Sequence, residues 1–150
     1  MLSGEILIFF QEINMKVITL REPWASLIGE QIKKIETRSW FTNYRGEMYI
    51  HAGLSKIPSK DARMNRLAKE LQGPFHYGTI FAKCNLSDCI LIDESYAESV
   101  KKSDYMCYDC GDYTPGRYAW ILTDIELIDP IVATGKLGLW NYTIPEGGNN

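Results

Sequence analysis

The sequence predicts an α+β domain: a small mixed β-barrel with two or three short helices. Several short runs rich in β-branched and aromatic residues indicate strands, and the helical patterns between them are short. Strands and helices do not alternate regularly, as they do in a parallel α/β sheet. One domain is expected, because 150 residues with 45% hydrophobic content can bury one core but leave little for a second.

The first half of the chain predicts three strands and two helices. Short apolar or β-branched runs predict strands over 16–20 and 48–52, and a charged segment between them predicts a strand from Ile35. A helix is expected over 21–28, where Pro23 suits a first helical turn. A second is expected over 59–71, with Ser59 as its N-cap and Gly73-Pro74 as its stop.

The second half predicts further short strands around one polar helix. Strand-like runs cover 78–86, 89–92, 117–128 and 131–133, and 94–101 suits the helix. The segment 103–116 is rich in Asp, Tyr and Gly and is expected to be a loop. Trp120 is expected in the core.

Met15 directly precedes the first predicted strand, so we expect 1–14 to be an N-terminal extension, 15–142 the domain, and 143–150 a flexible tail. No apolar stretch is long enough to cross a bilayer. The run Ile6-Leu7-Ile8-Phe9-Phe10 is too short for a signal-peptide core. A cytoplasmic protein without a membrane partner is therefore expected.

Charge is unevenly distributed along a chain whose net charge is -3. Residues 15–60 carry eight Lys/Arg and four Asp/Glu, whereas residues 87–129 carry three and ten. The net charge argues against non-specific binding to nucleic acid, but a locally basic site remains open.

Four cysteines, Cys84, Cys89, Cys107 and Cys110, are expected to be buried or free thiols in a reducing compartment. Their two pairs have spacings close to those of zinc ligands, so a zinc site is the alternative. No metal is expected, because the first pair falls in two strands joined by a turn and lacks flanking glycines. No Gly-rich phosphate loop, Ser/His/Asp set or His pair is present, and we expect no cofactor.

Lys33, Glu36 and Arg38 are the main candidate site residues. Side chains alternate along a strand, so Glu36 and Arg38 share a face, and Lys33 can swing toward them if it lies in the preceding turn. An ammonium, a carboxylate and a guanidinium would then meet in front of Trp40. The alternative is a solvated strand with ordinary ion pairs.

Several segments together resemble the ASCH domain, a member of the PUA-like superfamily. They are Thr19-Leu20-Arg21-Glu22-Pro23-Trp24-Ala25, Lys33-x-x-Glu36-x-Arg38-Ser39-Trp40, Asn43-Tyr44-Arg45-Gly46, Ile50-His51-Ala52, Tyr118-Ala119-Trp120 and Gly135-Lys136-Leu137-Gly138-Leu139-Trp140. The resemblance runs from about Lys16 to Trp140. It implies a PUA-like β-barrel, a fold shared with RNA-binding domains, and a cleft lined by the charged motif. The family motif is Gly-x-Lys-x-x-Glu-x-Arg, and Gln31 stands at its glycine, where positive φ favours Gly.

The first functional hypothesis is binding of RNA or of a nucleotide or modified nucleoside in this cleft. Trp24, Trp40 and Tyr44 are candidates for stacking on a base. Lys33 and Arg38 would meet phosphate or carbonyl oxygens, and Glu36 would accept from an exocyclic amine. Arg45 is a candidate phosphate contact. His51 is a candidate ligand contact or proton carrier, although a histidine that only satisfies a backbone carbonyl is more frequent.

Two alternatives come from other functional classes. Bacterial relatives that resemble this domain hydrolyse acetylcytidine with a lysine at the Lys33 position and a threonine at the Glu36 position, and others are linked to RNA cleavage. An amidohydrolase or ribonuclease would here use Lys33, Glu36 and Arg38, with Glu36 as general base, while Thr37 is expected to face away. The third hypothesis is a protein-interaction domain that uses the acidic 87–129 region.

Overall fold

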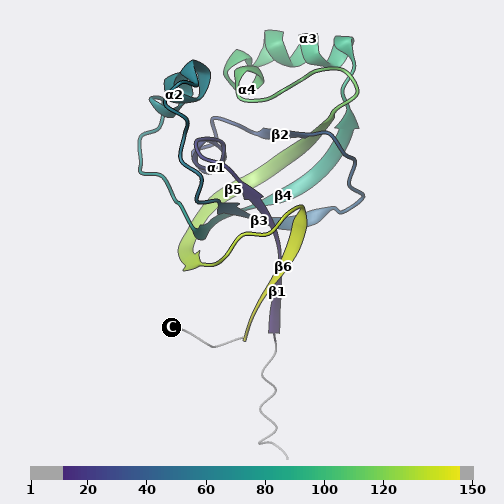
Figure 1. Cartoon of the computed structure of the whole chain (residues 1–150). Helices are drawn as coiled ribbons and strands as arrows, with labels where there is room; N and C mark the ends of the chain where they lie inside the picture. The colour runs from purple at the N-terminus through teal and green to yellow at the C-terminus, as the bar shows by residue number, and fades with distance from the viewer. Residues whose placement is uncertain (1–11, 146–150) are drawn as a thin grey trace, which may run out of the picture.

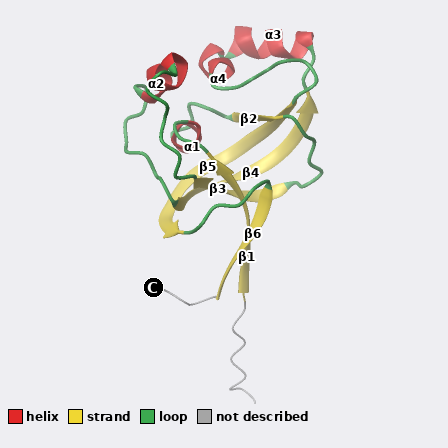
Figure 2. Cartoon of the chain, viewed as in Figure 1, coloured by secondary structure: helices red, strands yellow, loops and turns green. Residues whose placement is uncertain are grey.

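A computed structural model describes residues 12–145 as a six-stranded sheet with four helices (Figure 1). The predicted α+β class is confirmed. The strands are β1 (Glu12–Leu20), β2 (Ile35–Arg38), β3 (Gly46–Ala52), β4 (Thr79–Leu91), β5 (Tyr118–Val132) and β6 (Leu139–Pro145). The helices are α1 (Trp24–Gly29), α2 (Ala62–Ala68), α3 (Glu94–Ser103) and α4 (Tyr105–Asp109). Figure 2 shows that α2, α3 and α4 gather at one end, while β1 and β6 extend to the other.

The sheet is not closed into the predicted barrel. Its strand order is β2-β5-β4-β3-β1-β6, so β2 and β6 are its edges among the described strands. β1 and β3 run parallel, and the other pairs are antiparallel. Although β2 and β1 do not pair, Nη2 of Arg38 lies 3.4 Å from the carbonyl oxygen of Thr19. A side chain therefore spans the gap that strand pairing leaves open.

Two predicted strand breaks are absent, because β4 and β5 are each continuous. The predicted strands 78–86 and 89–92 are one strand, β4, with register shifts against β5. On β5, the residue paired with Ala82 is Leu127 and the residue paired with Ile80 is Ile131, so Pro130 falls between paired positions. Such an unpaired stretch tolerates the missing proline N–H, which explains why Pro130 does not end the strand.

Aspartate caps decide where three of the helices begin. Asp61, rather than the predicted Ser59, caps α2 by accepting a hydrogen bond from the amide of Met64 at 2.9 Å. Asp93 caps α3 in the same way. Asp104 caps α4, which lies in the segment predicted to be a loop. The prediction of a loop there was wrong, because a cap makes even a five-residue helix possible in a polar segment.

Strand pairing crosses both expected domain boundaries. β1 begins at Glu12, which pairs with Pro145 at the end of β6, and Asn14 pairs with Thr143. Residues 12–14 and 143–145 therefore continue the sheet. The rest of the expected extension and tail, residues 1–11 and 146–150, lies outside the described residues.

The core lies between the curled sheet and α1. Trp120 is fully buried, as predicted, and packs in one cluster with Ile18, Ile50 and Leu86. From α1, Ala25 and Ile28 join this cluster. These contacts fix α1 against the sheet and place the turn after α1 beside the start of β2. No helix within residues 12–145 is both long and apolar enough to cross a membrane.

All four cysteines are buried free thiols. Burial raises the pKa of Cys84 to about 12 and that of Cys110 to about 11. In the described part of the chain, no group of three or more His, Cys, Asp or Glu side chains is placed to hold a metal ion.

We therefore expect the native thiols to react slowly with DTNB at pH 8 and to react fully in guanidinium. An unfolded thiol ionises near pH 8.5, so the stability contributed by Cys84 and Cys110 is complete below that pH. It is lost as the pH rises toward their folded pKa values of about 12 and 11. Denaturant titrations from pH 8 to pH 10.5 should show falling stability. Rapid labelling of the native protein would contradict the burial.

Candidate functional site

The turn between α1 and β2 positions the charged motif. The amides of Ile32 and Lys33 both donate to the carbonyl of Leu27, each at 3.0 Å, which folds the chain back directly after the helix. Gln31 adopts φ = 61° to make this turn. The family places glycine at this position, and the left-handed backbone explains why. Here glutamine makes the turn, and its side chain donates to the carbonyl of Ile125 at 3.3 Å.

Lys33 is a buried ammonium with a full set of partners. The residue is 1% exposed. Its Nζ donates to the carbonyls of Ile35 at 2.9 Å and Cys110 at 2.7 Å, and lies 3.4 Å from Oε1 of Glu36. An ammonium has three N–H donors, so these contacts use all of them. In this arrangement Lys33 has no free lone pair with which to act as a base.

Glu36 lies between the two cations of the motif. Its Oε1 faces Lys33, and its Oε2 lies 2.9 Å from Nε of Arg38. The Arg38 Nε–H makes no well-directed hydrogen bond, so this contact is an ion pair. The three side chains meet in the order ammonium, carboxylate, guanidinium. The burial of Lys33 and Glu36 distinguishes this arrangement from a solvated strand face.

A cavity of about 280 Å³ opens beside Lys33 and Glu36. Four of its lining residues come from α1, the turn and β2, and five come from much later in the chain. The lining residues are Trp24, Lys33, Glu36, Thr37, Arg63, Cys110, Gly111, Asp112 and Arg117. We call it the motif cavity.

Thr37 lines the motif cavity together with Glu36, which strand alternation alone did not predict. Its Oγ1 accepts a hydrogen bond from the amide of Asp112 at 3.0 Å. Its side chain therefore lies against the 110–112 segment that forms the opposite wall.

Two arginines that the sequence reasoning missed hold this wall in place. Arg63 on α2 donates to the carbonyls of Asp109 at 2.8 Å and Gly111 at 2.9 Å. Arg117 donates to the carbonyls of Asp112 at 3.1 Å and Thr37 at 3.3 Å. They lie 27 and 81 residues from Glu36 in sequence, and no local pattern connects either to the motif.

Aromatic and charged groups meet at Trp24. The guanidinium carbon of Arg63 lies 5.2 Å from the centre of the Trp24 indole, and Nζ of Lys33 lies 5.7 Å from it. Both distances allow cation–π attraction. The half-buried indole is therefore the aromatic surface of the motif cavity.

Asp112 remains ionised to lower pH than an ordinary aspartate. Hydrogen bonds from the Thr114 side chain and amide lower its pKa, and Arg117 and Arg63 lower it further. The motif cavity thus carries two carboxylates, Glu36 and Asp112, opposite three cations.

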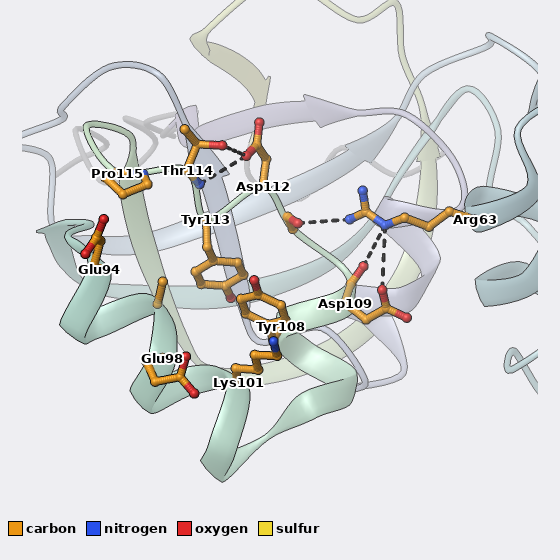
Figure 3. A pocket seen from close by; sticks show the side chains of 12 residues that line it. Arg63, Glu94, Glu98, Lys101, Tyr108, Asp109, Asp112, Tyr113, Thr114 and Pro115 are labelled. Carbon is orange, nitrogen blue, oxygen red and sulfur yellow. Dashed lines mark hydrogen bonds and ion pairs between the residues drawn. The ribbon is translucent and has the colours of Figure 1, made fainter.

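A second cavity of about 720 Å³ adjoins the first and shares Arg63, Gly111 and Asp112 with it. Figure 3 shows Arg63 directed at Asp109, with Tyr108 and Tyr113 at the centre of this second cavity. The two tyrosine rings are stacked, with centroids 5.0 Å apart. Acidic side chains from α3 stand on its far side.

Arg38 pairs with Glu36 but does not line the motif cavity, contrary to the prediction, and three further predicted ligand residues also lie outside it. Trp40 packs edge-on against Trp120, with ring centroids 4.8 Å apart, and is 37% exposed. Tyr44 donates its hydroxyl to the carbonyl of Glu47 at 2.5 Å. Arg45 donates to the carbonyls of Thr42 and Tyr44. Of the stacking candidates, only Trp24 lines the motif cavity.

His51 is also outside the motif cavity, and both of its ring nitrogens are bonded. Nε2 lies 2.7 Å from the carbonyl of Ala133 and therefore donates to it. Nδ1 then accepts from the hydroxyl of Thr19 at 3.2 Å, and that hydroxyl accepts from Nε1 of Trp140 at 3.0 Å. His51 thus ties three segments together as a buried structural residue.

A carboxylate, a serine and a histidine meet at Glu22, Ser26 and His76, although the sequence shows no such set. The Ser26 hydroxyl lies 2.6 Å from Oε2 of Glu22 and 3.0 Å from Nδ1 of His76. The Ser26 hydroxyl has one proton. If this proton is donated to Glu22, Nδ1 of His76 must donate its own proton to the hydroxyl oxygen. Glu22 also accepts from the amides of Ser26 and His76. Because Ser26 is fully buried and Glu22 bonds it directly, the cluster anchors α1 and is no nucleophile–base–acid relay.

We expect Gln31→Gly to be more stable than Gln31→Ala by about 1 kcal/mol. Both variants lose the hydrogen bond to Ile125, and only alanine places a Cβ on the left-handed backbone. Urea denaturation of both proteins measures the difference. Equal stabilities, or a more stable alanine variant, would contradict the conformational role of this position.

We expect Lys33→Met to destabilise the fold by about 3–5 kcal/mol, because it leaves Glu36 and two carbonyls without their buried partner. The adjacent Lys34 is exposed, so Lys34→Met is the matched control, with a change within about 0.5 kcal/mol. Urea denaturation compares them. Similar values for both would show that the buried ammonium contributes nothing.

Comparison with known proteins finds relatives that match part of this chain. Activating signal cointegrator 1 from Mus musculus is 30% identical over 98 residues, which cover 58% of this chain and 17% of that protein. The Homo sapiens protein is 32% identical over 81 residues, covering 49% and 14%. The chain thus matches less than a fifth of each relative's length.

Among solved structures, a point mutant of ZmASCH from Zymomonas mobilis aligns with a TM-score of 0.49 and 17% identity, covering 79% of this chain and 75% of that one. The ASCH domain itself matches residues 18–132, from the end of β1 through β5. With this match over most of its length, the chain belongs to the ASCH domain family.

Proposed function

We propose that this ASCH domain binds a nucleobase in the motif cavity, either within RNA or as a free or modified nucleoside. The observation that carries the proposal is the meeting of the Trp24 indole, the Arg63 guanidinium and the Glu36 carboxylate around one small cavity. At about 280 Å³ it is slightly smaller than typical ligand pockets, which span about 300–1,000 Å³. A flat heterocycle suits this size better than a longer ligand.

The lining offers each type of contact that a base needs. The Trp24 ring and the Arg63 plane supply stacking surfaces. Glu36 is an acceptor for an exocyclic amine, and Arg117 is a donor for a carbonyl or phosphate oxygen. Arg63 and Arg117 keep part of their side chains exposed, so they are available at the mouth of the cavity.

Lys33 acts in this proposal by fixing Glu36 and the 110–112 wall. Its ammonium is committed to two carbonyls and one carboxylate. Hydrolysis is less well supported, because its two candidate reactive groups, the Lys33 amine and the Thr37 Oγ1, already have hydrogen-bond partners. Binding is therefore the primary proposal, and the hydrolase remains an alternative that the same samples test.

We expect Arg63→Met to weaken nucleoside or RNA binding by about 10-fold, because it removes the guanidinium beside Trp24. Arg66→Met is the matched control. Arg66 lies on the same helix and pairs with the same Asp109 but does not line the motif cavity. Calorimetry with adenosine, guanosine, cytidine, uridine, N4-acetylcytidine and short RNAs measures the affinities, and mass spectrometry of the same mixtures detects turnover.

Glu36→Gln should change the preference among bases, because an amide can donate where a carboxylate only accepts. A ligand with an exocyclic amine should lose affinity relative to one with a carbonyl at that position. Equal weakening by the Arg63 and Arg66 substitutions, or no binding of any ligand in the panel, would overturn the proposal. Products that vanish in Glu36→Gln would establish the hydrolase.

A further inference from the structure

A cavity of about 930 Å³, larger than the two described above, shares no lining residue with the motif cavity. It lies at the carboxyl ends of β1, β3 and β5, beside the loop that leads to β6. Its lining residues are Thr19, His51, Gly53, Leu54, Tyr77, Gly78, Thr79, Val132, Ala133, Thr134, Gly135, Lys136 and Leu137. We call it the Leu137 groove.

The rim of the Leu137 groove exposes aliphatic side chains. Leu54 is 74% exposed, Val132 is 83% exposed and Leu137 is 98% exposed. A single exposed leucine is ordinary, but three aliphatic residues around one cavity form an apolar patch of the kind found at interaction sites. Leu54 leans over Gly78, since a Cβ there would lie 3.1 Å from its Cδ2.

The floor of the groove is preformed. His51 joins the Thr19 hydroxyl to the carbonyl of Ala133, which fixes β1, β3 and the end of β5 relative to one another. Gly135 packs so closely on this histidine that a Cβ would lie 2.9 Å from its ring. A partner would therefore meet a rigid surface and lose little affinity to ordering it.

The charged side chain that lines the groove is basic. None of its lining residues is acidic, and Lys136 is one of them. Nζ of Lys56 lies 4.3 Å from the centre of the Tyr77 ring, and Arg21 reaches the Lys56 carbonyl. Burial raises the pKa of Tyr77, and the charge of Glu22 raises it further; Glu22 is itself fully buried and bonded to Ser26 and His76. An apolar rim with basic flanks complements a ligand that is apolar on one face and acidic on the other.

We infer that the Leu137 groove docks an acidic amphipathic helix of a partner protein, with its leucines against Leu54, Val132 and Leu137 and its carboxylates facing Lys56 and Lys136. Nucleic acid fits less well. Aliphatic side chains offer no stacking plane, and Tyr77 is the one Phe, Tyr or Trp among the residues that line the groove. This inference is independent of the proposed nucleobase site.

The probe is a fluorescein-labelled model peptide of about 16 residues, with leucine at i, i+3, i+4 and i+7 and glutamate elsewhere. We expect it to bind the full chain in the micromolar range by anisotropy, and to shift the NMR signals of Leu54 and Leu137. The double variant Leu54→Ser/Leu137→Ser should weaken binding by at least about 10-fold. Leu91→Ser, at another exposed leucine outside the groove, should leave it unchanged.

Charge reversal separates the electrostatic part of the inference from the apolar part. Lys56→Glu/Lys136→Glu should lose the glutamate peptide and bind a matched peptide with lysine at every glutamate position. No binding of the glutamate peptide, equal binding of both peptides to the natural chain, or an unchanged affinity in Leu54→Ser/Leu137→Ser would overturn the inference. A short RNA that displaces the peptide and shifts the same leucine signals would assign the groove to nucleic acid instead.

Discussion

The buried ammonium of Lys33 is the interaction on which the site depends. A charge removed from water needs close partners, and Lys33 finds them in two carbonyls and one carboxylate. One carbonyl belongs to Ile35 and the other to Cys110, 77 residues away. The ammonium therefore joins the α1–β2 turn to the segment after α4. The bond to Cys110 links the two walls of the motif cavity, as does the hydrogen bond between the Asp112 amide and Thr37.

The open sheet makes a second constraint important. β2 is a four-residue edge strand that pairs only with β5, so strand hydrogen bonds alone do not fix its position relative to β1. Arg38 supplies that link by reaching from Glu36 to the carbonyl of Thr19. Thr19 in turn holds His51 and Trp140 through its hydroxyl. The charged motif and the floor of the Leu137 groove thus belong to one connected set of polar contacts.

The sequence predicted the α+β class, the burial of Trp120 and, as one of two alternatives, the meeting of Lys33, Glu36 and Arg38. These follow from local rules of periodicity, hydrophobicity and side-chain alternation, which act over a few residues. It also located Gln31 as the residue under backbone constraint, because the motif places glycine there. Continuous β4 and β5 escaped prediction, since a strand with register shifts resembles two shorter strands in its pattern.

The residues that complete the site from distant parts of the chain are known only from the tertiary structure. Arg63 and Arg117 line the motif cavity because the 109–112 segment folds against both α2 and β2. Trp40 lies outside the site because it packs on Trp120. The sheet is open, with β2 and β6 as its edges among the described strands. The physical reason is the same in each case. Such contacts join residues that are far apart in the chain, and their energies depend on packing and burial that no local pattern records.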